Sequence, residues 1–198
     1  MAISKSKTRE NIPEILQRDN PILRQISKEV PVEKITSDEI QSVIADMKAA
    51  LLREGDGVGI AAPQIGVSLR IFVVAHEAVA MASGDRDLDS KSLALKKEAR
   101  PEDDLVFINP VITKKSKETE FFEEGCLSVR YAYGKIKRHK KVTLVAYDET
   151  GKKTTRGASG LLAEIFQHEV DHLNGTLFID NAKDIQEIPP ESLTDSSL

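Results

Sequence analysis

The chain has 198 residues, of which 40% are hydrophobic and 30% charged, and its formal net charge at pH 7 is −4. This length and balance are typical of one globular domain with a sizeable core, and the charge excludes a whole-protein attraction to nucleic acid or anionic membranes. No apolar run approaches the roughly 18–20 residues that cross a bilayer, and the N-terminal residues lack the apolar centre of a secretory signal, so we expect a cytoplasmic protein.

The first predicted element is an amphipathic helix within residues 35–57. Apolar residues recur there at helical spacing, Thr36 and Glu39 fit a capping box, and a Gly-Asp-Gly sequence predicts the end of the helix. The next stretch, GVGIAAPQIG at residues 57–66, is too rich in glycine for a helix and is interrupted by a proline. It leads into a predicted strand at residues 70–76.

The middle of the chain combines a charged insertion with predicted strands. Residues 84–104 are densely charged and predict a surface insertion. A strand is predicted at residues 105–113, where Pro110 indicates an edge strand or a strand end. Residues 118–128 are expected to be extended. Alternating apolar residues at Val142, Leu144 and Ala146, followed by a Glu-Thr-Gly turn and a return strand, predict a β-hairpin at residues 140–157.

The last long element is a predicted helix at residues 159–174, with Ser159 as its N-cap and Gly175 as its stop. Residues 183–198 are polar, contain two adjacent prolines, and predict a mobile C-terminal tail. The elements together predict a single α+β domain over residues 1–182. In that domain, antiparallel or mixed β-sheets pack around the last helix.

The last helix carries the sequence HEVDH at residues 168–172, which has the spacing of a metal site. Residues four apart on a helix share a face, so two imidazoles there can bind one metal ion with Glu169 beside them to move protons. The alternative interpretation is a solvated or capping face. Because both histidines share their face with Leu161 and Ile165, we expect them to point inward, where a metal ion offsets the cost of burying two imidazoles.

A catalytic metal site of this kind needs a third protein ligand. One metalloprotease motif continues as HExxHxxGxxH, but its last position here is Phe178, which cannot bind metal. Glu191 has the spacing of another arrangement, but it follows two prolines instead of lying in a helix. The remaining candidate is Cys126, the single cysteine of the chain, whose alternative role is that of a small buried apolar residue.

The glycine-rich stretch supplies a candidate for oxyanion stabilisation. The side-chain amide of Gln64 can donate to a developing oxyanion, and the backbone N–H of Leu127, directly after Cys126, can be the second donor. The alternative for Gln64 is a structural amide that only supports its loop. Two donors and a metal ion directed at one carbonyl oxygen would form a site for amide hydrolysis.

Three motifs in this order resemble those of the peptide deformylase family. They are GVGIAAPQ at residues 57–64, EGCLS at 124–128 and HEVDH at 168–172. The similarity extends over most of the chain, from about residue 20 to residue 180. The resemblance implies an α+β hydrolase that removes the N-formyl group from the initiator methionine of nascent polypeptides and releases formate.

The resemblance also implies roles for individual residues. Cys126, His168 and His172 would bind one divalent metal ion, Fe²⁺ in cells, with Zn²⁺, Ni²⁺ or Co²⁺ as substitutes. Glu169 would be the general base, and Gln64 with the Leu127 amide would hold the oxyanion. The residues expected to contact substrate are Val58, Gly59, Phe122, Glu124 and Ile165. A monomer is expected, with nascent chains and the ribosome exit region as partners and no nucleic-acid motif.

One departure and two rival interpretations accompany the resemblance. Where the family often has a proline-glycine turn after CLSV, this chain has RYAYG at residues 130–134, so its peptide preference beyond methionine is open. The first rival is a zinc peptidase that uses the HExxH motif without Cys126. The second is a non-catalytic metal-binding or ribosome-associated module, which is disfavoured because both Glu169 and Gln64 are present.

Overall fold

The computed structural model describes residues 12–82 and 101–188, so most of the predicted insertion at 84–104 and residues 189–198 of the predicted tail lie outside the described residues. Within the described ranges, none of the helices combines the length and the apolarity that crossing a membrane requires. The helices and strands are α1 (Asp38–Glu54), β1 (Gly59–Ala61), β2 (Ile71–Val74), α2 (His76–Ala82), β3 (Leu105–Lys115), β4 (Thr119–Cys126), β5 (Val129–His139), β6 (Lys141–Tyr147), β7 (Lys153–Ser159), α4 (Gly160–Leu173) and β8 (Lys183–Glu187).

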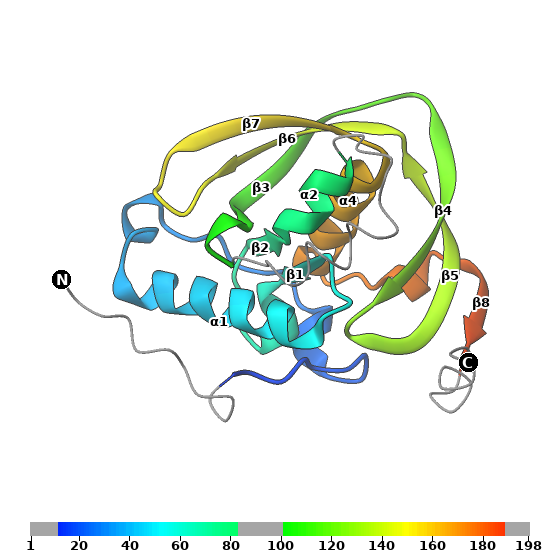
Figure 1. The fold of residues 1–198 in the computed structure, drawn as a ribbon, viewed down its shortest axis with the longest axis horizontal. Coiled ribbons are helices and arrows are strands. Elements are labelled where there is room, and N and C mark those ends of the chain that lie inside the picture. The colour runs from blue at the N-terminus through cyan, green and yellow to red at the C-terminus, as the bar shows by residue number, and fades with distance from the viewer. Residues whose placement is uncertain (1–11, 83–100, 189–198) are drawn as a thin grey trace.

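The strands form two sheets. The large sheet has the order β1-β2-β3-β6-β7 and the small sheet the order β4-β5-β8, and the neighbouring strands of both sheets are antiparallel. Helix α4 contacts strands of both sheets and lies inside the molecule, with β4 and β5 arching past its end (Figure 1). The predicted α+β fold, with sheets packed around the motif-bearing helix, is therefore confirmed.

Strand β2 shows how the large sheet is held between two helices. All four of its residues are buried, and their side chains alternate between the two faces. Ile71 and Val73 pack into the core cluster that contains the apolar face of α1. Phe72 and Val74 pack into the cluster around α4, where the ring of Phe72 lies 5.9 Å from that of Phe166. The second cluster fixes the position of α4 against the sheet.

Helix α1 follows the prediction closely at its end and differs by one residue at its start. The N-cap is Ser37, whose hydroxyl accepts a hydrogen bond of 3.5 Å from the Ile40 N–H, so the predicted cap at Thr36 is wrong by one position. Gly55 ends the helix as predicted, with a left-handed φ of 70° that glycine adopts at little cost. The loop that follows leads directly into β1.

Pro110 lies in β3, which is an inner strand, so the prediction of an edge strand or a strand end is wrong. The register of β3 against β6 shifts between Ile108 and Val111, and Asn109 in this irregularity has a φ of 51°. A bulge tolerates proline because the ladder hydrogen bonds are already interrupted there. The side chain of Asn109 bonds the backbone N–H and C=O of Val30 at 2.8 and 2.7 Å, which holds the bulge in place.

Four further elements were not predicted, the first of which is the short strand β1. Helix α2 directly follows β2, and β5 occupies the segment that was interpreted only as a departure from the family pattern. Residues 183–187, assigned to the mobile tail, instead form β8 and pair with β5, where Ala132 lies opposite Glu187. The predicted boundary at residue 182 is therefore corrected to the end of β8.

Candidate metal centre

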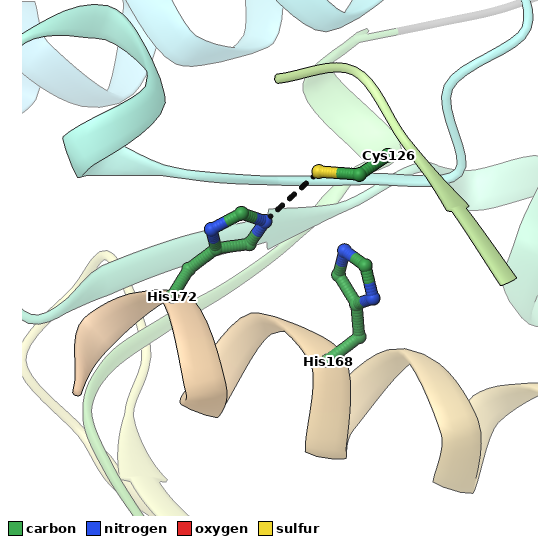
Figure 2. Close-up of side chains that lie close together, drawn as sticks. All are labelled: Cys126, His168 and His172. Atoms are coloured by element: carbon green, nitrogen blue, oxygen red, sulfur yellow. Dashed lines mark hydrogen bonds between the residues drawn. The ribbon is translucent and has the colours of Figure 1, made fainter. Parts of the chain in front are cut away.

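Three side chains with metal-binding atoms converge where the end of β4 meets α4. His168 and His172 project from one face of α4, and Cys126 is the last residue of β4. Figure 2 shows the three side chains directed toward one another. Their donor atoms all lie within 4.8 Å of one another, and the Cys126 sulfur is 3.2 Å from Nε2 of His172. The structure thus brings together the three residues that the sequence predicted as metal ligands.

The spacing and burial of these atoms fit a single metal ion. Typical metal–sulfur and metal–nitrogen bonds in a tetrahedral site place the donor atoms about 3.3–3.6 Å apart. The distance of 3.2 Å between the Cys126 sulfur and Nε2 of His172 is close to this value. His172 is 1% exposed. Burial holds the pKa of His172 well below its ordinary value, so its imidazole is neutral and keeps a lone pair for a metal.

A charged network lies behind the histidines. Nδ1 of His168 is 2.8 Å from Oε2 of Glu124, and Arg138 donates to both Glu124 oxygens at 2.7 and 3.0 Å and to Asp171 at 2.5 Å. Although burial alone would raise the pKa of Glu124, its bonds to His168 and Arg138 lower it, so the carboxylate stays ionised. A carboxylate on the outer nitrogen of a histidine fixes the ring orientation and directs the other nitrogen inward. Both oxygens of Glu124 are occupied in this way, which assigns it to the orientation of His168. Glu124 also lines the cavity, so its predicted contact with substrate stays a prediction.

Glu169 lies on the same helix with its carboxylate against β1. It is 4% exposed, and its Oε2 has no hydrogen-bond partner among the described residues. A Cβ atom on residue 59 would lie 2.7 Å from Oε1 of Glu169, so a larger residue there would displace this carboxylate. Burial raises the pKa of Glu169 to about 7, which places its proton exchange near neutral pH.

Gln64 has a fixed orientation beside the sulfur. Its side-chain oxygen accepts a hydrogen bond of 2.8 Å from the Ala61 N–H, so its NH₂ group must face the other way. That NH₂ group donates to the Ser128 hydroxyl at 3.1 Å and lies 3.7 Å from the Cys126 sulfur. The Ser128 N–H also approaches the sulfur, at 3.4 Å. Hydrogen-bond donors therefore surround the sulfur and the adjoining space, as a thiolate and a developing oxyanion would need.

A cavity of about 380 Å³ opens at this centre. Most of the predicted site residues line it, including Val58, Gly59, Gln64, Leu127, Ile165 and Glu169. Its apolar wall includes Val58 of the loop before β1, Leu127 of the turn between β4 and β5, and Ile165 of α4. Phe122 was also expected to contact substrate, but it is not one of the described residues that line this cavity.

Sequence reasoning missed Arg138 and Glu164, two charged residues of the site, and named Arg130 only as part of the segment 130–134 that departs from the family pattern. Arg138 orders the buried network, Glu164 lines the cavity one helical turn before His168, and Arg130 bridges β5 to the end of α1. Arg130 donates to Asp56 at 2.9 Å and to Glu54. The available signal was alternation: from Ala132 to Arg138 every second residue of β5 is buried, although two of these inward positions are glycine and arginine.

The fold and this centre define a class of protein. A Cys-His-His donor set beside a buried glutamate, at the base of a partly apolar cavity, is the arrangement of a mononuclear metallohydrolase. A model of the polypeptide deformylase family matches residues 12–187. The chain belongs to the polypeptide deformylase family.

Individual relatives support the same assignment. The chain is 39% identical over 176 residues to a chloroplastic peptide deformylase 1A from Solanum lycopersicum, covering 88% of this chain and 61% of that protein. It is 42% identical to a peptide deformylase from Fusobacterium nucleatum, covering 80% and 77% of the two chains. The chain thus spans about three fifths of the tomato protein's length, whereas it spans most of the bacterial one.

Solved structures share the fold. A peptide deformylase from Legionella pneumophila superposes with a TM-score of 0.68 at 36% identity, over 92% of this chain and 89% of that one. A peptide deformylase from Thermotoga maritima gives a TM-score of 0.70 at 31% identity, over 87% and 99% of the two chains.

Proposed function

We propose that this chain is a metal-dependent peptide deformylase that hydrolyses the N-formyl amide at the initiator methionine of nascent polypeptides and releases formate. One observation carries the proposal: the donor atoms of Cys126, His168 and His172 lie within 4.8 Å of one another, with the buried carboxylate of Glu169 on the same helix and the amide of Gln64 beside the sulfur. The relatives named peptide deformylase support the choice of substrate.

Cys126, His168 and His172 would hold one divalent metal ion, which we propose to be Fe²⁺ in cells, with Zn²⁺, Ni²⁺ or Co²⁺ as substitutes. When bound, the ion supplies Lewis-acid activation of water and of the formyl carbonyl. One thiolate and two imidazoles suit both Fe²⁺ and Zn²⁺. Elemental analysis of protein purified without oxygen tests the proposal of iron, which stoichiometric zinc in such a sample would overturn.

The remaining steps belong to the chain's own residues. Glu169 accepts a proton from the attacking water and delivers it to the methionine nitrogen as the carbon–oxygen bond forms and the carbon–nitrogen bond breaks. The Gln64 NH₂ group and the Leu127 N–H stabilise the oxyanion on the formyl carbon. The backbone of Gly59, at the start of β1, pairs with the peptide as an added strand.

The methionine side chain would lie against the apolar part of the cavity wall. Val58, Leu127 and Ile165 supply this surface from three different segments, the loop before β1, the β4–β5 turn and α4. An unbranched thioether adapts to such a surface without a shape-specific pocket. With Phe122 outside the wall, we assign methionine recognition to these three residues.

The decisive experiment measures formate release from formyl-Met-Ala-Ser, using enzyme purified without oxygen and supplied with Fe²⁺ or Ni²⁺. Mass spectrometry of the same reaction records whether internal peptide bonds are cut. Formate together with intact Met-Ala-Ser supports the proposal. Internal cleavage would favour the zinc-peptidase alternative, which needs the two histidines and Glu169 but not Cys126. A metal-replete sample that releases no formate would contradict the proposal.

The cellular setting is also a proposal. We propose a monomer that acts in the cytoplasm on chains leaving the ribosome; the bacterial relatives favour this compartment, whereas the tomato relative is named chloroplastic. Cell fractionation, light scattering and co-sedimentation with translating ribosomes test the three parts separately. Recovery of the enzyme in an organelle fraction, a dimer mass, or no ribosome association would each overturn the corresponding part.

A further inference from the structure

Two turns at one corner of the molecule bring a group of lysines together. The Ser116 N–H of the β3–β4 turn donates to the Lys141 C=O at 2.8 Å. The Lys140 N–H of the β5–β6 turn donates to the Glu118 C=O at 3.1 Å, so the two turns lie side by side. We call the exposed lysines of these turns and of the adjoining strand ends the lysine corner; they are Lys114, Lys115, Lys117, Lys137 and Lys141. The corner is on the side of the molecule where β4 and β5 arch away from α1 (Figure 1).

The positive charge of the lysine corner is not neutralised within the described part of the chain. There, none of its five ammonium groups forms an ion pair with a carboxylate. Two acidic residues, Glu118 and Glu120, are close in sequence, and Glu120 is already paired with a sixth lysine, Lys140, at 3.5 Å. The whole chain has a net charge of −4, so positive charge is concentrated here on a protein that is otherwise acidic. A surface of this kind attracts an anionic partner.

An exposed aromatic ring adjoins the lysine corner. Phe121 on the outer face of β4 is 53% exposed and lies directly opposite Lys137 of β5. The next pair outward along the same face is Glu123 opposite Lys135, and Lys135 is 3.6 Å from Asp184, so the excess of positive charge ends there. Lysines beside an exposed ring are typical of surfaces that bind single-stranded nucleic acid, because a base stacks on the ring while ammonium groups contact the phosphates.

We propose that the lysine corner and Phe121 bind single-stranded nucleic acid, with the lysines on successive phosphates and the ring of Phe121 stacked on a base. RNA and DNA share this chemistry. Contacts of this kind read the backbone and not the sequence, so we expect no strong sequence preference. The corner is assembled from two separate segments, and therefore no motif in the sequence marks it.

This binding surface is independent of the proposed deformylase function. None of the corner lysines is among the described residues that line the cavity at the metal centre. Thr119 and Cys126 are the two ends of β4, which places the corner about 20 Å along the strand from the metal ligand. A nucleic acid on the corner would leave the cavity open to a peptide.

The test measures fluorescence anisotropy of labelled 15-nucleotide RNA and DNA of the same mixed sequence, titrated with the full chain. We expect a Kd in the micromolar range at about 50 mM salt, and an affinity about a hundredfold lower at about 200 mM, because five phosphate contacts on a single strand give a slope of about −3.5 in log affinity against log salt. Binding of either strand supports the proposal, and the lower Kd identifies the preferred one.

Variants locate the surface. Lys117→Gln combined with Lys137→Gln should raise Kd about tenfold and reduce the salt slope by about 1.4. Phe121→Leu keeps an apolar side chain without a flat ring and should raise Kd several-fold with the salt slope unchanged. The control combines Lys34→Gln with Lys152→Gln, two exposed lysines of which the second lies in the β6–β7 turn, at the other end of β6 from Lys141. This control has the same charge change and should leave Kd unaltered.

The outcomes that would overturn the proposal are distinct. No binding of either oligonucleotide at low salt would exclude it, and so would an equal loss in the control variant, since the cause would then be overall charge. Binding of anionic phosphatidylserine vesicles without binding of oligonucleotides would assign the corner to a membrane instead. If the variants fold poorly, a wild-type affinity that does not change with salt would still contradict phosphate contacts. Formate release is measured on the same samples, and its absence would contradict only the deformylase function.

Discussion

The two sides of the metal centre are built differently. Behind the histidines lies the buried network of His168, Glu124, Arg138 and Asp171, in which the paired Arg138 and Glu124 side chains are 7% and 2% exposed. In front lies the cavity rim, where Arg130 bridges Asp56 and Glu54, and where the Arg130 and Asp56 side chains are 29% and 64% exposed. The same kind of ion pair therefore occurs in two environments.

The difference in solvation decides what each side can do. A buried ion pair holds its members firmly, because loss of one partner leaves an uncompensated charge away from water. An exposed pair is screened and contributes little to stability. We infer that the buried network sets the geometry of the metal ligands, whereas the rim is free to vary and to select among peptides.

Glu169 provides the largest expected effect and sharpens the comparison. It is as buried as the network, but one of its oxygens has no hydrogen-bond partner among the described residues. We therefore expect the buried Glu169 carboxylate to act in catalysis and to contribute little to the stability of the fold. Glu169→Gln should lower kcat by about 10²–10⁴-fold, the usual contribution of general acid–base help. Metal content and thermal stability should be preserved, as measured by elemental analysis and calorimetry. A variant that turns over near the wild-type rate would refute the assigned base.

Arg138 tests whether the buried network supports the centre. Arg138→Met removes the partner of the buried Glu124 carboxylate and should cost about 3–5 kcal/mol in the free energy of unfolding. Metal affinity should fall by about 10–100-fold, because Glu124 then no longer orients His168. Adding Glu124→Gln to this variant should recover part of the lost stability. A cost below 1 kcal/mol for the single variant would contradict the inferred role of the network.

The sequence predicted the residues of the centre better than the strands that support it. The helix that carries the HEVDH motif was predicted because its apolar residues recur with helical period, and the hairpin of β6 and β7 because the apolar residues of its first strand alternate. Strand β5 was not predicted because one of its inward positions is Arg138. The burial of this arginine is explained only by its ion pairs with Glu124 and Asp171, which lie on other elements. A charge on a core face hides the period that identifies a strand.

Long-range contacts explain the other differences. The bulge at Pro110 depends on Asn109, which bonds the backbone of a segment about eighty residues earlier. Strand β8 is polar and exposed along its length and is ordered by pairing with β5, so no local pattern marks it. Nothing in the local sequence distinguishes Glu164 from other polar residues on a helix, and only the structure shows that it lines the cavity.

Asp104 is an intermediate case between the two environments. It is half-buried, and its side chain accepts a hydrogen bond of 3.0 Å from the His76 N–H at the start of α2. Burial raises the pKa of Asp104 from 3.8 to about 6. The folded state therefore binds more protons than the unfolded state between about pH 4 and pH 6, so the stability that depends on this group falls as the pH rises through that window.

Asp104→Asn keeps an oxygen for the His76 N–H and removes the charge. The variant should match wild type near pH 4 and become more stable by about 1 kcal/mol at pH 7, a value reduced from the full linkage because solvent screens the group. Urea unfolding at a series of pH values measures the difference. Asp103→Asn, an exposed neighbour with the same charge change, is the control. A constant difference at all pH values would exclude Asp104 as the cause.

Arg130 gives the smallest expected effect and the most direct contrast with Arg138. Both arginines lie on β5 and each bonds two carboxylates, so removing them changes the same chemistry in different surroundings. Arg130→Gln should change the free energy of unfolding by only about 0–1 kcal/mol and leave metal content unaltered. The small loss should shrink further at high salt, as measured by denaturant unfolding. A cost comparable to that of Arg138→Met would mean that the rim is as firmly built as the buried network, and that peptide selection cannot be changed there without disturbing the fold.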